Sequence, residues 1–221
     1  AAPVWDIFVR LFHWSLATSF LVAYLTGESE RWAQLHLVAG YTLLGLILFR
    51  LLWGFAGTRY ARFASFVPTP KAVISHLAAL RDRRPGHPVG HNPAGAVAIF
   101  ALLGLGLVTG ISGWLFIEEG GEWLEDIHES AASLMLAVVG LHVVGVLVVS
   151  RLQGQNLILS MLNGQQPGTR EQAIAHGRPV VALLLLASLF GFWAWSYTEA
   201  GQRVLGVAAA TEGGGRPAAD D

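Results

Sequence analysis

Four of the eight histidines in this sequence lie inside long apolar stretches, where other polar groups are scarce. His13 and His36 occupy the first two stretches, and His128 and His142 share a later one. Ionisable side chains are costly to place in a membrane and usually mark a functional site, and imidazole is a common metal ligand. The alternative for any single histidine is a structural hydrogen bond to a neighbouring helix. The histidines are therefore candidate residues for a metal or proton-transfer site.

The composition places these histidines in a membrane protein. Apolar residues make up 53% of the chain and charged residues 13%, and the mean hydropathy is +0.51. Several apolar runs reach about 20 residues, the length that crosses a bilayer. They cover residues 4–25, 32–55, 93–117, 127–149 and 179–197. Because lipid offers the backbone no hydrogen bonds, and because the runs lack the alternation of barrel strands, we predict an all-α integral membrane helical bundle.

The chain divides into a core and two smaller parts. Residues 1–165 are predicted to form a four-helix core with a cytoplasmic loop over residues 56–92. Residues 166–198 form a further cytoplasmic loop and a fifth transmembrane helix. Residues 199–221 form an acidic, Gly-rich tail, and we expect its last part, residues 208–221, to be poorly ordered.

Two other stretches complete the predicted organisation. The first apolar run is expected to be a retained helix, because no small-residue cleavage pattern for a signal peptide precedes Gly27. The stretch "PTPKAVISHLAALRDRR", residues 68–84, is expected to be a short amphipathic helix on the cytoplasmic surface. Five crossings leave little chain for a soluble domain.

The distribution of charge predicts the orientation. Cytoplasmic loops of membrane proteins carry an excess of Lys and Arg. Of the 14 Lys and Arg residues, all but three belong to the side that holds the N-terminus and the loops 56–92 and 150–178. The exceptions are Arg31, Arg203 and Arg216. We therefore predict a multi-pass protein of the bacterial cytoplasmic (inner) membrane, with a cytoplasmic N-terminus and a periplasmic C-terminus.

The spacing of the histidines predicts two pairs at two depths. Fourteen residues of helix place His128 and His142 about 40° apart around the axis and about 21 Å apart along it. With the predicted orientation, His13 and His142 both lie about 12 Å inside the cytoplasmic face. His36 and His128 are both shallow on the periplasmic side. Four independent structural histidines would not be expected to match in depth.

Two histidines at one depth on neighbouring helices are the arrangement that binds a haem iron from both sides. The sequence has no cysteine, which excludes covalent haem attachment, so we expect two haem b groups. His13 and His142 would bind the cytoplasmic-side iron, and His36 and His128 the periplasmic-side iron. An iron with two histidine ligands has no open position, so we expect electron transfer rather than substrate activation, and no catalytic residue.

Several segments are similar to a known family. They are "VWDIFVRLFHWSL", "HLVAGYTLLGLILFRLLWGFAGTRYARFASFVPTP", "GHNPAGA" and the helix with two histidines. Together they resemble the bacterial cytochrome b561 and nickel-iron hydrogenase b-type cytochrome family over residues 4–165. The resemblance implies two b haems on His13, His36, His128 and His142, and a quinone substrate near the cytoplasmic haem. It also implies a periplasmic partner, either a c-type cytochrome or a nickel-iron hydrogenase, and the fifth helix does not choose between them.

Charged residues near the predicted haems suggest further contacts. Arg10 and Arg50 on the cytoplasmic side could pair with haem propionates, although ordinary interfacial anchoring explains these two at least equally well. Arg31 is the candidate on the periplasmic side, because it is the only basic residue near His36 there. An acidic periplasmic loop could attract a basic redox partner, or it could simply reflect the lack of positive residues in periplasmic loops. Its residues are Glu118, Glu119, Glu122, Glu125 and Asp126.

The remaining histidines and the glycines receive simpler interpretations. We expect solvated loop histidines rather than a metal site at His76, His87, His91 and His176. Gly40, Gly45, Gly140 and Gly145 would either leave room for a flat macrocycle or serve helix packing. Packing alone is expected for Gly104, Gly106, Gly110 and Gly113.

These observations predict the electron-transfer subunit of a quinone-linked respiratory system rather than a stand-alone enzyme. Its surroundings would be lipid, quinone and a periplasmic redox protein, with no nucleic-acid partner. The direction of electron flow stays open at this point. One alternative is a proton-coupled transporter that uses the histidines as a relay, and another is a structural membrane anchor.

Overall fold

The computed structural model describes residues 1–84, 86 and 88–207, and it is a bundle of long helices. Among the described residues, five helices are long and apolar enough to cross a membrane. They are α1 (Ile7–Thr26), α2 (Ala33–Ala56), α4 (Pro93–Glu119), α5 (Glu122–Gln153) and α7 (Pro179–Ser196). Large apolar side chains face outward, as in Leu25 and Leu52, which are 71% and 70% exposed. The predicted all-α membrane bundle is confirmed.

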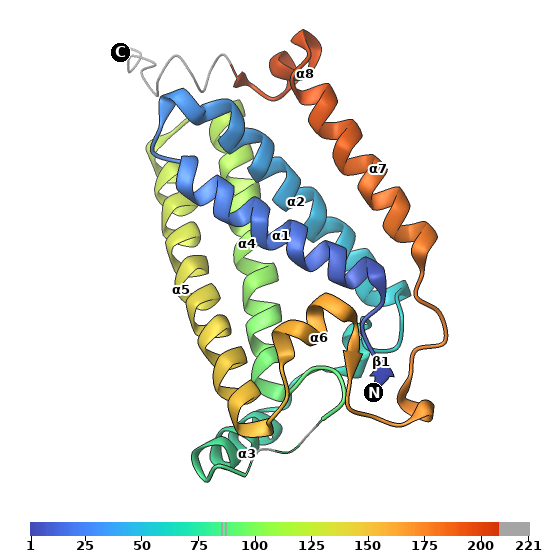
Figure 1. Ribbon diagram of the computed structural model, residues 1–221. Helices are drawn as coiled ribbons and strands as arrows, with labels where there is room; N and C mark the ends of the chain where they lie inside the picture. The colour runs from blue at the N-terminus through green and yellow to red at the C-terminus, as the bar shows by residue number, and fades with distance from the viewer. Residues whose placement is uncertain (85, 87, 208–221) are drawn as a thin grey trace.

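The helices pack as two antiparallel pairs with one additional helix (Figure 1). α1 packs on α2, α4 packs on α5, and α2 also contacts α4. α7 lies against α1 and α2, and the Trp193 indole N–H donates to the Thr42 hydroxyl of α2 at 2.9 Å. We call the end that carries the N-terminus, α3 and α6 the inner end, and the end where α1 joins α2 and α4 joins α5 the outer end.

Local sequence signals set where the helices begin and end. α1 begins at Ile7 rather than at Val4, because the Asp6 carboxylate accepts a hydrogen bond from the Val9 amide at 2.7 Å and caps the helix. α5 is longer than the predicted run 127–149 at both ends. It starts after Gly121, with two acidic residues in its first turn that suit the helix dipole, and ends at Gly154 in a left-handed conformation.

Several short elements join the long helices. A helix is predicted within residues 68–84, and α3 (Pro70–Arg81) lies there. The first part of the predicted tail is helical, since α8 spans Glu199–Val204, capped by Thr198. Residues 208–221, where we expect poor order, lie outside the described residues. The other short elements are α6 (Leu157–Asn163), β1 (Ala2–Pro3), β2 (Gln165–Gln166), and the 3₁₀ turns Glu30–Trp32, Phe63–Ser65 and Arg170–Gln172.

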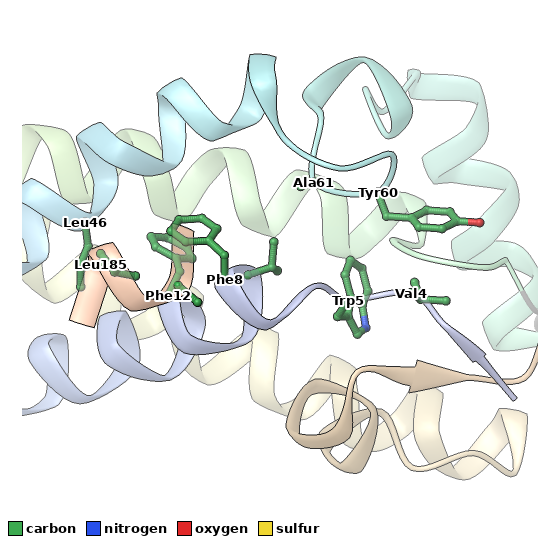
Figure 2. Close-up of a cluster of buried hydrophobic side chains, with 10 residues drawn as sticks. Val4, Trp5, Phe8, Phe12, Leu46, Tyr60, Ala61 and Leu185 are labelled. Atoms are coloured by element: carbon green, nitrogen blue, oxygen red, sulfur yellow. The ribbon is translucent and has the colours of Figure 1, made fainter. Parts of the chain in front are cut away.

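The N-terminal segment and the loops of the inner end form a packed cap. β1 pairs with β2 in antiparallel register, and the amides of Val4 and Trp5 donate to the Gly164 carbonyl. Tyr60 donates its hydroxyl to the Gln172 carbonyl at 2.8 Å. Figure 2 shows Trp5 and Tyr60 in this cap, with Phe8 following along α1 toward the bundle. The cap closes the inner end of the bundle with aromatic side chains.

Candidate functional site

The four membrane histidines lie in two facing pairs. The ring centroids of His13 on α1 and His142 on α5 are 6.5 Å apart, with an angle of 53° between the ring planes. Those of His36 on α2 and His128 on α5 are 6.0 Å apart, at 73°. All four side chains are half-buried. The structure therefore brings together the same residues that the depth argument pairs.

The separation of the rings fits two ligands on one metal ion. Two metal–nitrogen bonds of about 2 Å each, added to the depth of two imidazole rings, separate the centroids by about 6 Å. No hydrogen bond joins the two rings of either pair within the described residues. Among those residues there is also no group of three or more His, Cys, Asp or Glu side chains that could hold a metal ion. Each pair would need a cofactor to supply the remaining ligands.

Main-chain carbonyls orient both rings of the outer pair. His36 Nδ1 lies 2.8 Å from the Ala23 carbonyl oxygen, and His128 Nδ1 lies 2.8 Å from the Thr109 carbonyl oxygen. A carbonyl only accepts hydrogen bonds, so each Nδ1 must carry the proton. Each Nε2 then keeps its lone pair free to bind a metal.

Gly113 allows the His128 ring to approach α4. A Cβ atom at this position would lie 2.7 Å from His128 Nδ1. Gly113 therefore serves packing, as predicted, and the side chain that it accommodates is one of the paired histidines. Packing against α2 applies to Gly106, which faces Ile47, and to Gly110, where a Cβ would lie 2.9 Å from Leu44.

The inner pair has no comparable orienting contacts. His13 Nδ1 is buried and has no hydrogen-bond partner among the described residues. Its ring meets Trp14 edge-on, with the centroids 5.1 Å apart. Within the same part of the chain, no hydrogen bond is found for the His142 ring either. The inner rings are held by packing.

The predicted propionate partners occupy three different environments. Arg10 donates from its guanidinium to the Leu162 carbonyl near the end of α6, so it braces that helix. Arg31 is exposed and lies over the Trp32 ring at 5.3 Å. Arg50 is only 4% exposed, and its Nη1 has no hydrogen-bond partner in the described part of the chain.

Two histidines expected in solvated loops are in fact packed against other side chains. His76 on α3 is 8% exposed, and burial lowers its pKa. His91 packs between Trp5 and Phe66, with ring centroids 4.7 Å and 4.2 Å away. Burial, followed by the nearby charges of Arg50 and His142, lowers the pKa of His91 to about 3. The inner-end cap folds over this loop, which the local sequence does not indicate.

The other two loop histidines differ from these. His176 is exposed, as expected, and His87 lies outside the described residues.

A separate cavity of about 310 Å³ lies between α1, α2 and α7. Its walls are largely apolar and include Trp14, Thr42 and Trp193. None of the four histidines lines it, and neither does any other residue of α5. This cavity is therefore distinct from the histidine pairs.

The fold is an all-α membrane bundle that carries two facing pairs of histidines. The prokaryotic cytochrome b561 family matches residues 4–164, and the chain belongs to that family. It is thus a multi-pass membrane protein of the b-type cytochrome class, which implies haem b as cofactor and membrane electron transfer as activity.

Curated relatives point in the same direction. A probable Ni/Fe-hydrogenase B-type cytochrome subunit of Bradyrhizobium diazoefficiens is 24% identical over 74% of this chain and 85% of the relative. Proteins of the same description from Azotobacter vinelandii and Cupriavidus necator are 27% and 31% identical. Those alignments span 54% and 57% of this chain, and 61% and 63% of the relatives. No solved structure matches the chain.

The residues present fit a haem. The facing imidazoles of each pair would hold a haem iron, and the haem would supply the remaining ligands that the protein lacks. Gly40 lies about 40° from His36 around α2, and Gly145 about 60° from His142 around α5. A Cβ atom at either glycine would meet nothing within 4 Å, which leaves space beside the rings. By the same geometry Gly45 and Gly140 lie far from the nearest histidine around their helices, at about 160° to 180°.

Proposed function

We propose that this protein is a dihaem b-type cytochrome that transfers electrons across the membrane between the quinone pool and a periplasmic redox protein. The single observation that carries the proposal is the pair of facing imidazoles at each end of α5. His13 and His142 would bind the iron of the inner haem, and His36 and His128 that of the outer haem.

The chain's own residues would hold and space the two haems. When bound, each haem supplies reversible one-electron chemistry, and two histidine ligands close its iron to other reactants. His128 and His142 fix the two sites about 21 Å apart along one helix, which spans most of a hydrocarbon core of about 30 Å.

The charge distribution supports the orientation. The loops of the inner end hold most of the Lys and Arg residues, so we place this end and the N-terminus in the cytoplasm and the C-terminus in the periplasm. A quinone would then react on the cytoplasmic side, near the inner haem. Residues 1–165 would form the functional core, with residues 166–198 and 199–221 as additions to it.

The partner would bind at the outer end. The relatives' descriptions name a Ni/Fe-hydrogenase, so we propose a hydrogenase as partner and a c-type cytochrome as the second candidate. The acidic residues of the α4–α5 turn are exposed at this end. They are Glu118, Glu119, Glu122, Glu125 and Asp126. The protein would then be an electron-transfer subunit rather than a complete enzyme.

Two other functions have less support. A proton relay needs rings that exchange protons through hydrogen bonds, whereas the outer pair has both Nδ1 atoms held by main-chain carbonyls. A structural anchor would not require histidines that face one another at two depths.

The proposal is tested by counting haems in the purified protein. We expect a pyridine haemochrome assay and a reduced-minus-oxidised spectrum to give two haem b per chain. His142→Ala should remove the inner haem and keep the outer one, and His36→Ala should do the reverse. A colourless wild-type protein would rule the proposal out, as would a His142→Ala variant that keeps both haems.

A further inference from the structure

Arg50 is a buried cation, and no described residue forms an ion pair with it. Its side chain is 4% exposed, its guanidinium lies 4.8 Å from the centre of the Phe63 ring, and its Nη1 has no partner among the described residues. A buried charge is strongly destabilising unless an opposite charge or hydrogen bonds compensate for it. The position therefore suits an anion that the polypeptide itself does not provide.

Asp6, the acidic residue whose charge acts on Arg50, already has other hydrogen-bond partners. Asp6 interacts with Arg50 through its charge but forms no ion pair with it. The Asp6 carboxylate instead accepts hydrogen bonds from the Val9 amide at 2.7 Å and from the Thr58 hydroxyl at 2.6 Å. Arg50 thus keeps donor capacity for a further carboxylate.

Helix geometry places Arg50 at the level of the inner histidine pair. Arg50 follows His36 on α2 by the same number of residues that separates His142 from His128 on α5. In both helices this spacing gives about 40° of rotation and about 21 Å of rise. Since His36 and His128 face each other at the outer end, Arg50 and His142 come level at the inner end.

His91 adds a neutral donor on the same side. It precedes α4 in the inner-end cap, and its ring is packed between Trp5 and Phe66. Phe66 also contacts Phe63, with ring centroids 5.9 Å apart, and Phe63 lies under the Arg50 guanidinium, so His91 and Arg50 flank the same aromatic cluster. Trp5 and Phe66 shield the His91 ring partly from water, and a less polar environment strengthens an ionic hydrogen bond.

We propose that Arg50 and His91 form a carboxylate-binding site that holds a propionate of the inner haem. This inference rests on the proposed function, because it requires a haem between His13 and His142. The planar guanidinium binds a carboxylate through parallel hydrogen bonds, and the neutral imidazole of His91 donates one more. At the outer end, the corresponding candidate Arg31 is exposed, so the two ends differ.

The first test uses the full-length, haem-loaded protein and the potentials of its two haems. Arg50→Gln should lower the midpoint potential of the inner haem, because a lost positive charge favours the oxidised iron. Arg50→Lys should restore part of this shift, and His91→Asn should give a smaller shift in the same direction. The outer haem serves as the internal reference, and Arg31→Gln as the matched control should leave the inner potential unchanged.

The second test removes the carboxylate from the ligand instead of the protein. Haem-free protein is reconstituted with haem b or with its dimethyl ester, and occupancy of the inner site is measured for each. Wild-type protein should prefer haem b, and Arg50→Gln should lose most of that preference. The comparison of haem b with its ester in the wild-type protein remains decisive even where Arg50→Gln binds haem poorly.

The outcomes separate the two proposals. Two haems in the wild type, with unchanged potentials in both Arg50→Gln and His91→Asn and no preference for haem b over its ester, would overturn the carboxylate site alone. A wild-type protein that lacks the inner haem would overturn the proposed function and the carboxylate site together. Equal shifts of both haem potentials in Arg50→Gln would also count against the site, because they indicate a general structural change.

Discussion

The outer and inner histidine pairs use the same side chains in different surroundings. In the outer pair, His36 and His128 each have Nδ1 fixed at 2.8 Å from a carbonyl oxygen. In the inner pair, His13 Nδ1 has no hydrogen-bond partner among the described residues, and a buried arginine lies at the same level. The difference teaches that two similar pairs of rings can be distinguished by the groups that contact them.

This difference has an electrostatic direction under the proposed ligation. A hydrogen bond from Nδ1 to a carbonyl makes the other nitrogen a stronger donor to the metal, which favours the oxidised iron. The exposed acidic residues of the α4–α5 turn act in the same sense at the outer end. At the inner end, the buried Arg50 cation favours the reduced iron. Electrons would therefore move downhill from the outer site to the inner site.

The largest expected effect comes from Gly113→Ala, which acts on the outer pair alone. The new Cβ would lie 2.7 Å from His128 Nδ1, so the ring must move and its bond to the Thr109 carbonyl is lost. We expect haem content to fall from two toward one per chain, with the inner haem retained, as measured by the haemochrome assay and redox titration. The matched control is Gly104→Ala on the same helix, where a Cβ would meet nothing within 4 Å. Equal haem content in the two variants would contradict the role given to Gly113.

The second prediction concerns the order of the two potentials in the wild type. A potentiometric titration followed by absorbance should give two waves, with the outer haem at the lower potential. The waves are assigned with Gly113→Ala, which removes the outer one, and His142→Ala, which removes the inner one. If the outer haem titrated at the higher potential, the electrostatic comparison of the two ends would be wrong.

The third prediction tests the cap that closes only the inner end. Asp6→Ala removes the N-cap of α1 and the acceptor for Thr58, so it should lower the free energy of unfolding by about 1–2 kcal/mol. It should also shift the midpoint potential of the inner haem while leaving that of the outer haem unchanged. The comparison variant is Thr69→Ala, which removes the N-cap of the peripheral helix α3. That variant should change neither haem's midpoint potential. Thermal unfolding measures the change in stability, and redox titration measures the change in potential. Equal shifts of the inner haem's midpoint potential in the two variants would show that the cap does not support the inner site.

The pairing of the histidines was predictable from sequence because it depends on few quantities. Helix rise fixes the depth of a residue within its helix, and the bias of Lys and Arg fixes which end of each helix is cytoplasmic. Together they place His13 level with His142 and His36 level with His128. The spacing of fourteen residues between His36 and Arg50 likewise indicates that Arg50 lies at the depth of the inner pair.

The surroundings of the pairs could not be predicted in this way. The contacts of His128 with Gly113 and Thr109 depend on how α4 rotates against α5, and no periodicity in either helix encodes that rotation. The burial of His91 depends on Trp5, which lies far away in sequence and reaches the loop only after β1 pairs with β2. Tertiary packing therefore decides which loop histidine is solvated and which is enclosed.

The smallest expected effect comes from the acidic residues of the outer end, which act through charge at a distance. Glu122 and Glu125 are exposed in the first turn of α5, on the side where the proposed partner binds. Glu122→Gln combined with Glu125→Gln should slow electron transfer with a basic redox partner roughly two- to ten-fold at low salt, and less at high salt, because salt screens exposed charges. Asp82→Asn removes an exposed acid at the inner end and should leave the rate unchanged. A rate independent of ionic strength in the wild type would mean that the partner is not guided by these charges, and the two ends would then differ only in the surroundings of their histidines.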